Sequence, residues 1–320
     1  MEQYSITISN TGDSIAANLQ EFILWMQYQG WSIRTIETYS NNIQQFIDFL
    51  KNEIETHSVD DINTNNLFKY QHFVHNLRIK SGKSITISSM HTKLVSIRSF
   101  LQFLYMNRKI NFKPDLIIRL PVKRQPLPKN ILSENQIERL LSKPDVSKLL
   151  GLRNKAIIEL LYASGIRNME LRNLSINDID LDQLQVMIRK GKNQKDRVIP
   201  MGEIAAYWID KYINSVRYQL FSSFSENILF LSKSGRKITR ANLIWIISKY
   251  SYQAGLPTPV TPHTLRHACA THMLKNGADI RYIQEHLGHA SVATTQIYTR
   301  VIITDLQRVF RETHPRAIKK

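Results

Sequence analysis

The chain has 320 residues, which is enough for two sizeable hydrophobic cores. Its 43 Lys and Arg residues against 26 Asp and Glu give a formal net charge of +17, which is too basic for an ordinary metabolic enzyme. This charge predicts a polyanionic partner, nucleic acid above all, with a merely solvated basic surface as the alternative. No stretch reaches the roughly 18 apolar residues of a membrane span and no leader pattern opens the chain, so we expect a cytoplasmic protein with no membrane partner.

The N-terminal region predicts a helical domain. Residues 1–12 are polar and are expected to form a flexible extension. Within residues 13–120, apolar side chains recur at helical spacing in four segments, which predicts a compact four-helix bundle. We expect Ser32 to cap the second helix. The four segments run through residues 15–26, 36–50, 67–77 and 90–104.

Four basic residues surround the S-G-K-S turn between the third and fourth segments. At this turn and on the polar face of the fourth segment they could contact DNA phosphates. A solvated helix face explains any single one of them equally well, so their role in DNA binding is a hypothesis. The four are Lys80, Lys83, Lys93 and Arg98.

A proline-rich segment separates the helical domain from the rest of the chain. Residues 121–130 hold three prolines among charged residues, which predicts an extended linker. Residues 1–125 carry 14 Lys and Arg against 10 Asp and Glu, whereas the remainder carries 29 against 16. Most of the excess positive charge therefore lies in the second domain, residues 131–320.

The second domain begins with a helix whose S-E-N-Q start is a capping box. The next, apolar helix is expected to end at Gly165, a residue suited to a left-handed C-cap, and Arg167 begins a short helix after it. Residues 184–189 and 197–200 flank the polar turn K-G-K-N-Q-K-D, which predicts a β-hairpin. Helical periodicity resumes beyond it, so the predicted fold class is mainly α with one small β-hairpin.

Four motifs follow one another in the second domain: Y-A-S-G-I-R-N-M-E-L, G-K-N-Q-K-D-R, H-T-L-R-H, and L-G-H followed by I-Y-T. Their order and spacing resemble those of the tyrosine recombinases, the phage integrase and Xer group, and the resemblance covers nearly the whole chain. The tail T-H-P-R-A is especially similar to the Xer-like site-specific recombinases. The resemblance implies an N-terminal SAM-like core-binding domain and a C-terminal catalytic domain, which together form a C-shaped DNA clamp.

The resemblance also implies a phosphodiester-transfer site with Tyr298 as the nucleophile. Attack on a DNA phosphate builds negative charge on the non-bridging oxygens, which Arg167 and Arg266 are expected to bind in bidentate geometry at any working pH. A free phenol titrates at about 10, so a base is needed, and we assign that role to His263. His289 is expected to donate a hydrogen bond to a phosphate oxygen.

The leaving oxygen requires an acid, and the hairpin turn supplies lysines for this purpose. Lys192 matches the family's general acid, which protonates the departing 5′ hydroxyl. Lys190 and Lys195 lie near enough to leave the assignment open, and they are also candidate DNA contacts.

Supporting residues complete the predicted site. Glu170 is expected to orient Arg167, and His267 to support its neighbours on the same helix. No metal and no other cofactor is expected, because two guanidinium groups can neutralise the phosphate and the chain has no clustered carboxylates. Cys269 is interpreted as a core residue and not as a nucleophile.

The last part of the chain carries an apolar stripe that must dock somewhere. Ile302, Leu306, Val309 and Phe310 form this stripe. Docking on its own domain is one possibility. The resemblance implies the other, in which the helix is donated to a neighbouring subunit when four recombinases assemble on two double-stranded DNA sites.

The implied activity is site-specific recombination through a 3′-phosphotyrosyl intermediate, without metal or ATP. It serves either to resolve chromosome or plasmid dimers or to integrate and excise a mobile element, and the polar N-terminal extension favours the mobile element. A type IB topoisomerase and a sequence-specific DNA-binding protein without cleavage activity are the alternatives.

Overall fold

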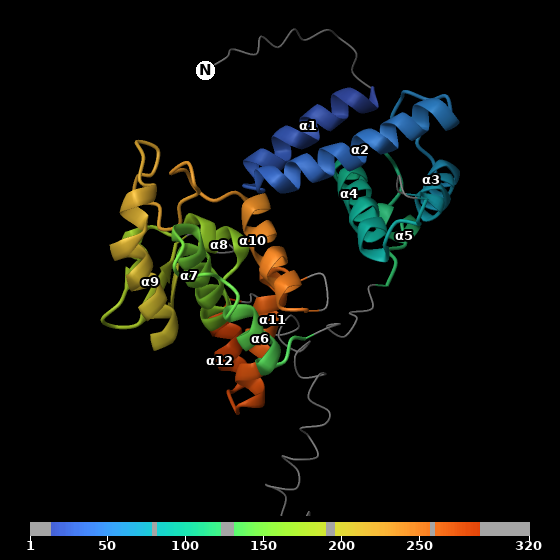
Figure 1. Cartoon of the computed structure of the whole chain (residues 1–320). Helices are drawn as coiled ribbons and strands as arrows, with labels where there is room; N and C mark the ends of the chain where they lie inside the picture. Colours follow the sequence, from blue (N-terminus) through green and yellow to red (C-terminus); the bar gives the residue numbers. More distant parts are fainter. Residues whose placement is uncertain (1–13, 79–81, 123–130, 190–195, 257–259, 289–320) are drawn as a thin grey trace, which may run out of the picture. The chain divides into compact units, whose positions relative to one another are not determined.

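The structure, a computed structural model, describes residues 14–78, 82–122, 131–189, 196–256 and 260–288. The chain divides into two compact units, residues 1–124 and 125–320 (Figure 1). Each unit has a hydrophobic core of its own. In the described segments, no helix is long and apolar enough to cross a lipid bilayer. The predicted fold class, mainly α with a small β-sheet, is confirmed.

Polar side chains cap the first turns of four helices in the first unit. Ser14, Ser32, Asn63 and Thr86 each accept a hydrogen bond from a backbone N–H of the helix that follows. A short fifth helix, which the sequence pattern did not predict, follows the four predicted ones. The helices are α1 Ile15–Tyr28, α2 Ile33–Glu53, α3 Thr64–Asn76, α4 Ile87–Met106 and α5 Pro114–Ile117.

Large aromatic side chains fill the core of the first unit. Phe22 and Phe46 are fully buried, and Tyr70 is almost so. The rings of Phe46 and Tyr70 meet edge to face with centroids 4.7 Å apart, a favourable arrangement of their quadrupoles. In the same core, Asn42 Nδ2 donates a hydrogen bond of 3.0 Å to Ser96 Oγ, which fixes α2 against α4.

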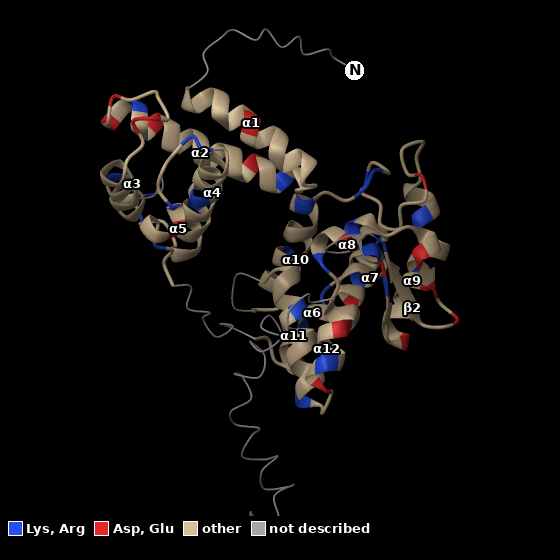
Figure 2. Cartoon of the chain, turned by 180° about the vertical axis from the view of Figure 1, so that it is seen from behind, with Lys and Arg blue, Asp and Glu red and all other residues tan. Residues whose placement is uncertain are grey.

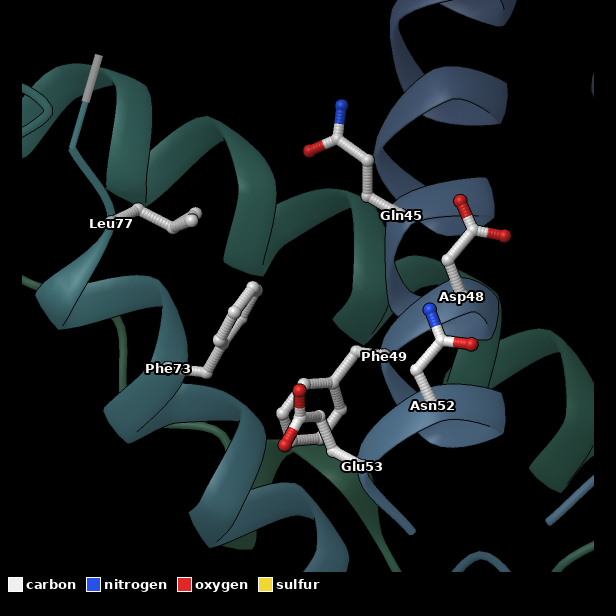
Figure 3. A pocket seen from close by; sticks show the side chains of 7 residues that line it. All are labelled: Gln45, Asp48, Phe49, Asn52, Glu53, Phe73 and Leu77. Carbon is white, nitrogen blue, oxygen red and sulfur yellow. The ribbon is translucent and has the colours of Figure 1, made fainter. Parts of the chain in front are cut away.

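A surface hollow of about 310 Å³ lies between α2 and α3 (Figure 3). Phe49, Phe73 and Leu77 give it apolar walls, and the side chains of Asp48 and Glu53 lie at its edge. Carboxylates repel phosphate groups, so this hollow is unsuited to the DNA backbone. The candidate site therefore lies elsewhere.

Helix α7 is the central element of the second unit. Its residues are buried on nearly every side, and it packs against α9 and α11. A helix that is buried on nearly every side, even at polar residues such as Arg153 and Glu159, belongs in the middle of a domain. The elements of this unit are α6 Glu134–Leu141, α7 Leu149–Ser164, α8 Asn168–Asn173, η1 Ile176–Asp178, β1 Ile179–Asp180, β2 Gln185–Ile188, β3 Arg197–Pro200, α9 Glu203–Ser215, η3 Arg217–Leu220, α10 Arg240–Gln253, α11 Pro262–Lys275 and α12 Ile280–Leu287.

The strands form an antiparallel sheet in the order β1-β2-β3. Val186 pairs with Ile179 on one side and with Ile199 on the other. Val186 and Ile199 are fully buried, so one face of the sheet joins the core. The predicted hairpin, β2 with β3, is confirmed, whereas β1 is too short to produce a recognisable alternation in the sequence.

Two helices end at left-handed glycines. Helix α7 ends at Gly165 (φ +57°), as the sequence predicted, and α12 ends at Gly288 (φ +65°). A Cβ atom on Gly165 would lie only 2.8 Å from Leu287 Cδ2, so the absent side chain also allows the end of α12 to approach the end of α7. The backbone carbonyl groups at these two helix ends hold the arginines of the candidate site.

Candidate active site

Arg167 immediately precedes α8 and faces the end of α12. Its guanidinium donates hydrogen bonds to Glu170 Oε1 (2.7 Å) and to the carbonyl oxygen of Gly288 (2.8 Å). Its backbone N–H donates to Glu170 Oε2 (2.8 Å). The side chain is 23% exposed, so this cation is held in place and yet reachable from solvent.

Glu170 is a buried carboxylate between two arginines. Besides Arg167, it accepts a bidentate pair from Arg197, with Nη1 to Oε1 at 3.0 Å and Nη2 to Oε2 at 2.9 Å. Burial by itself would raise the pKa of this carboxyl, but the hydrogen bonds from Arg197 and Arg167 outweigh it and lower the pKa to about 2. Glu170 therefore remains ionised at any physiological pH, and its orienting role stays a prediction.

Arg266 lies on α11 and is only 4% exposed. Its guanidinium donates to the carbonyl oxygens of Gly165 and Leu287, each at 2.6 Å. Both acceptors lie at helix C-termini, where the backbone dipoles concentrate negative charge, so the cation is well stabilised. Arg167 and Arg266 thus donate to consecutive carbonyl groups, Gly288 and Leu287.

His263 lies in the first turn of α11, three residues before Arg266. Partial burial lowers the pKa of its imidazole, and so do the positive charges of Arg266, Arg167 and Arg240. The side chain is accordingly neutral at pH 7, which is the form that can accept a proton. The imidazole of His263 is thus close enough to Arg266 and Arg167 for their charges to lower its pKa.

His267 follows His263 by one helical turn and is half-buried. Burial lowers the pKa of its imidazole, and His263 and Arg266 lower it further. A neutral imidazole between these groups is consistent with a supporting role, which stays a prediction.

His272 and Cys269 belong to the packing of the unit. His272 contacts the hydroxyl of Tyr162 and the carbonyl oxygen of Leu132, each at 2.9 Å. Cys269 is buried, and burial raises the pKa of its thiol to about 12, so it stays protonated. Within the described segments, no three His, Cys, Asp or Glu side chains are grouped to hold a metal ion.

Several predicted site residues lie outside the described residues. These are Tyr298, His289, Lys192, Lys190, Lys195 and Lys80. The described chain reaches the immediate neighbours of two of these segments. Gly288 is the residue before His289, and Arg197 opens the strand that leaves the hairpin turn.

The predicted DNA-binding residues of the first unit differ in their surroundings. Lys83 is exposed. The ammonium of Lys93 is bound by the side-chain amide oxygen of Gln45 on α2, and burial lowers its pKa. Arg98 forms an ion pair of 3.2 Å with Asp115. Two of these cations therefore have protein partners that the sequence could not reveal, and DNA contact by the set stays a prediction.

Sequence reasoning assigned no role to a group of basic residues beside α8. Figure 2 shows several Lys and Arg positions gathered around this helix. Arg172 Nε donates to the carbonyl oxygen of Ile238 (2.7 Å), and the ammonium of Lys237 contacts the side chain of Asn173. Burial lowers the pKa of Lys237, and the charge of Arg172 adds to this effect. Arg197 ends the motif G-K-N-Q-K-D-R, where the sequence alone indicates no function for it.

Comparison with known proteins identifies two regions of the chain. Residues 130–303 match the Phage integrase family, and residues 19–111 match the N-terminal SAM-like domain of phage integrases. The tyrosine recombinase XerD of Oceanobacillus iheyensis is 36% identical over 301 residues, which cover 93% of this chain and 98% of that protein. XerD of Pseudomonas putida is 40% identical over 225 residues, covering 70% and 74% of the two chains.

Solved structures share the fold at lower identity. The XerH site-specific recombinase bound to a palindromic difH substrate covers 92% of this chain and 84% of its own, with a TM-score of 0.70 and 20% identity. A lambda integrase dimer bound to a COC′ core site covers 96% and 98%, with a TM-score of 0.68 and 16% identity. With the family matched over more than half of the chain and XerD proteins similar along nearly its whole length, the chain belongs to the phage integrase family as a Xer-like tyrosine recombinase.

Proposed function

We propose that this site-specific recombinase cleaves and rejoins DNA through a covalent 3′-phosphotyrosyl bond at Tyr298. The observation that carries the assignment is the anchoring of Arg167 and Arg266 on the consecutive carbonyl groups of Gly288 and Leu287. This arrangement holds two permanent cations at the end of α12, whose C-cap Gly288 immediately precedes His289 in the sequence. Such a pair suits a single phosphate group, because guanidinium groups bind phosphate oxygens in bidentate geometry.

In the proposed reaction, the hydroxyl oxygen of Tyr298 attacks phosphorus and its proton passes to neutral His263. Charge that develops on the non-bridging oxygens is stabilised by Arg167, Arg266 and His289. Each such preorganised donor contributes about 2–4 kcal/mol. The bond from phosphorus to the 5′ oxygen breaks, and Lys192 protonates that oxygen. Attack by a 5′ hydroxyl of another strand reverses these steps, so no nucleotide cofactor is consumed.

The DNA partner is supported by charge and by the relatives. Residues 126–320 carry most of the net positive charge, and XerH and lambda integrase were solved bound to DNA sites. Recombination requires two such sites. We therefore propose four subunits on two double-stranded sites, with the apolar stripe Ile302–Phe310 docked on a neighbouring subunit.

Capture of a covalent adduct tests this proposal. The purified chain is incubated with fragments of the host genome that carry nicks, so that the cleaved strand diffuses away and the adduct accumulates. Wild type should form a denaturation-resistant adduct, and Tyr298→Phe should form none. An adduct of undiminished yield with Tyr298→Phe would overturn the assignment.

The same experiment identifies the DNA site and the competing activity. Sequencing the trapped fragments shows whether the site belongs to the chromosome or to a mobile element. Two labelled duplexes that carry this site should yield recombined products. Relaxation of supercoils without any recombined product would instead establish a topoisomerase, and site-specific binding without an adduct would establish a DNA-binding protein.

A further inference from the structure

Arg197, the first residue of β3, contacts both residues to which the Arg167 guanidinium donates, Glu170 and Gly288. Its guanidinium binds both carboxylate oxygens of Glu170, at 3.0 and 2.9 Å. It also lies against the end of α12, because a Cβ atom on Gly288 would be 2.9 Å from Arg197 Nε and 3.0 Å from Cζ. Glu170 and Gly288 are the same two residues to which the Arg167 guanidinium donates.

The charges in this cluster suggest why a second arginine is needed. Arg167 and Glu170 alone form a neutral pair, in which the carboxylate offsets the charge that a phosphate would encounter. With Arg197 bound to both carboxylate oxygens, the three side chains carry a net charge of +1. Because Glu170 and Arg197 are 6% and 16% exposed, water screens this effect weakly.

The position of Arg197 in the chain adds a second consequence. Residues 190–195, which include Lys192, precede β3 in the sequence with only Asp196 between them. Arg197 therefore links strand β3 to Glu170 and, through Glu170, to the Arg167 side chain. A shift of β3 would displace the Glu170 carboxylate and, with it, the guanidinium of Arg167.

We propose that Arg197 is a positioning residue, which keeps the charge of Arg167 available for the DNA phosphate and holds strand β3 against the Glu170 carboxylate that binds Arg167. This inference rests on the proposed function, in which Arg167 binds the phosphate. In this role Arg197 acts through Glu170 and is not required to touch the phosphate or the reacting atoms. A purely structural role would make Arg197 important for stability alone.

Two substitutions separate these roles. Arg197→Met removes the charge but keeps most of the side-chain volume, and Arg197→Lys restores a charge without the bidentate geometry. We expect Arg197→Met to reduce the single-turnover cleavage rate at saturating DNA by about 10-fold to 100-fold, by analogy with the loss of a group that orients a metal ligand. Arg197→Lys should recover a substantial part of this rate. DNA affinity should change little in either variant.

Arg189→Met is the matched control on the same hairpin. Arg189 forms an ion pair of 2.6 Å with Asp178, but its side chain is 62% exposed and it is bound to neither Glu170 nor Gly288 in the described contacts. Its loss should change cleavage by no more than about threefold. Thermal unfolding of each variant shows how much of the protein is folded at the assay temperature.

A further readout does not depend on cleavage. NMR titration of carboxyl-labelled protein should show the pKa of Glu170 rising in Arg197→Met, because one of its two cationic partners is gone. If the wild type cleaves DNA and folded Arg197→Met cleaves it at the same rate, this inference is overturned and the proposed function is not. Equal loss in the Met and Lys variants, matched by loss of folded protein, would also overturn it. A wild-type chain that forms no adduct would instead overturn the proposed function, and this inference with it.

Discussion

At the scale of single residues, the described part of the site is organised by carbonyl groups and one carboxylate. Arg266 is almost fully buried and bound to two helix-end carbonyls, whereas Arg167 is partly exposed. The two cations thus differ in accessibility, although the proposal gives them the same chemical task. Arg167 is the better target for substitution, because its loss leaves fewer buried acceptors without a donor.

Arg167→Ala should abolish most of the cleavage and leave DNA binding largely intact. Loss of one preorganised donor to a developing oxyanion lowers the rate by about 10²-fold to 10³-fold. Single-turnover cleavage and a binding titration on the same DNA measure the two effects. Met169→Ala, at a 65% exposed position of the same helix, is the control and should retain wild-type cleavage. Equal loss of binding and cleavage in Arg167→Ala would indicate a binding role only.

The pH dependence of cleavage tests His263. Its pKa lies below the ordinary 6.5 because of partial burial and the nearby arginines. A base acts in its neutral form, so the cleavage rate should hold as pH falls to 6.5 and decline only below it, as the imidazole becomes protonated. His263→Gln should lose this acidic decline together with most of the rate. A wild-type profile centred above pH 6.5 would contradict the assignment.

At the scale of elements, the ends of α7 and α12 position the site. Gly288→Ala places a methyl group against Arg197, and it also strains a backbone with φ of +65°. Gly255→Ala introduces the same strain at φ +62°, where a Cβ atom would meet nothing within 4 Å. Gly255→Ala should lose about 1–2 kcal/mol of stability, and Gly288→Ala should lose at least as much.

Only Gly288→Ala should also impair cleavage, because only it disturbs Arg197 and the carbonyl group that Arg167 uses. Thermal unfolding and single-turnover cleavage of both variants make the comparison. Similar cleavage rates in two equally stable variants would show that the end of α12 does not govern the chemistry.

Local signals made several elements predictable from the sequence. The capping box at Ser133, the end of α7 at Gly165 and the β2–β3 hairpin each depend on a few neighbouring residues. Helix α5 and strand β1 are too short to produce a periodic pattern. The bonds from Arg197 to Glu170 join residues 27 positions apart, and the bond from Arg167 to Gly288 joins residues 121 apart. Such pairings depend on tertiary structure and have no local signal.

At the scale of the whole molecule, the site residues and the net positive charge are unequally distributed between two units with separate cores. The second unit contains every described member of the candidate active site and most of the net positive charge. The first unit matches a SAM-like domain of phage integrases, and its predicted role in DNA binding depends on cations that partly serve its own packing. How the two units enclose DNA stays a prediction.

The identity of the tyrosine that becomes bonded to DNA is the central claim. Trypsin should release the adduct on a peptide of residues 282–300, which contains both Tyr282 and Tyr298. Tyr282 stacks on His286 and is 49% exposed, so it is an internal control for accessibility. Tandem mass spectrometry of nuclease-trimmed adduct should place the nucleotide on Tyr298, and Tyr282→Phe should leave the yield unchanged. A nucleotide on Tyr282, or on any tyrosine other than Tyr298, would contradict the proposed mechanism.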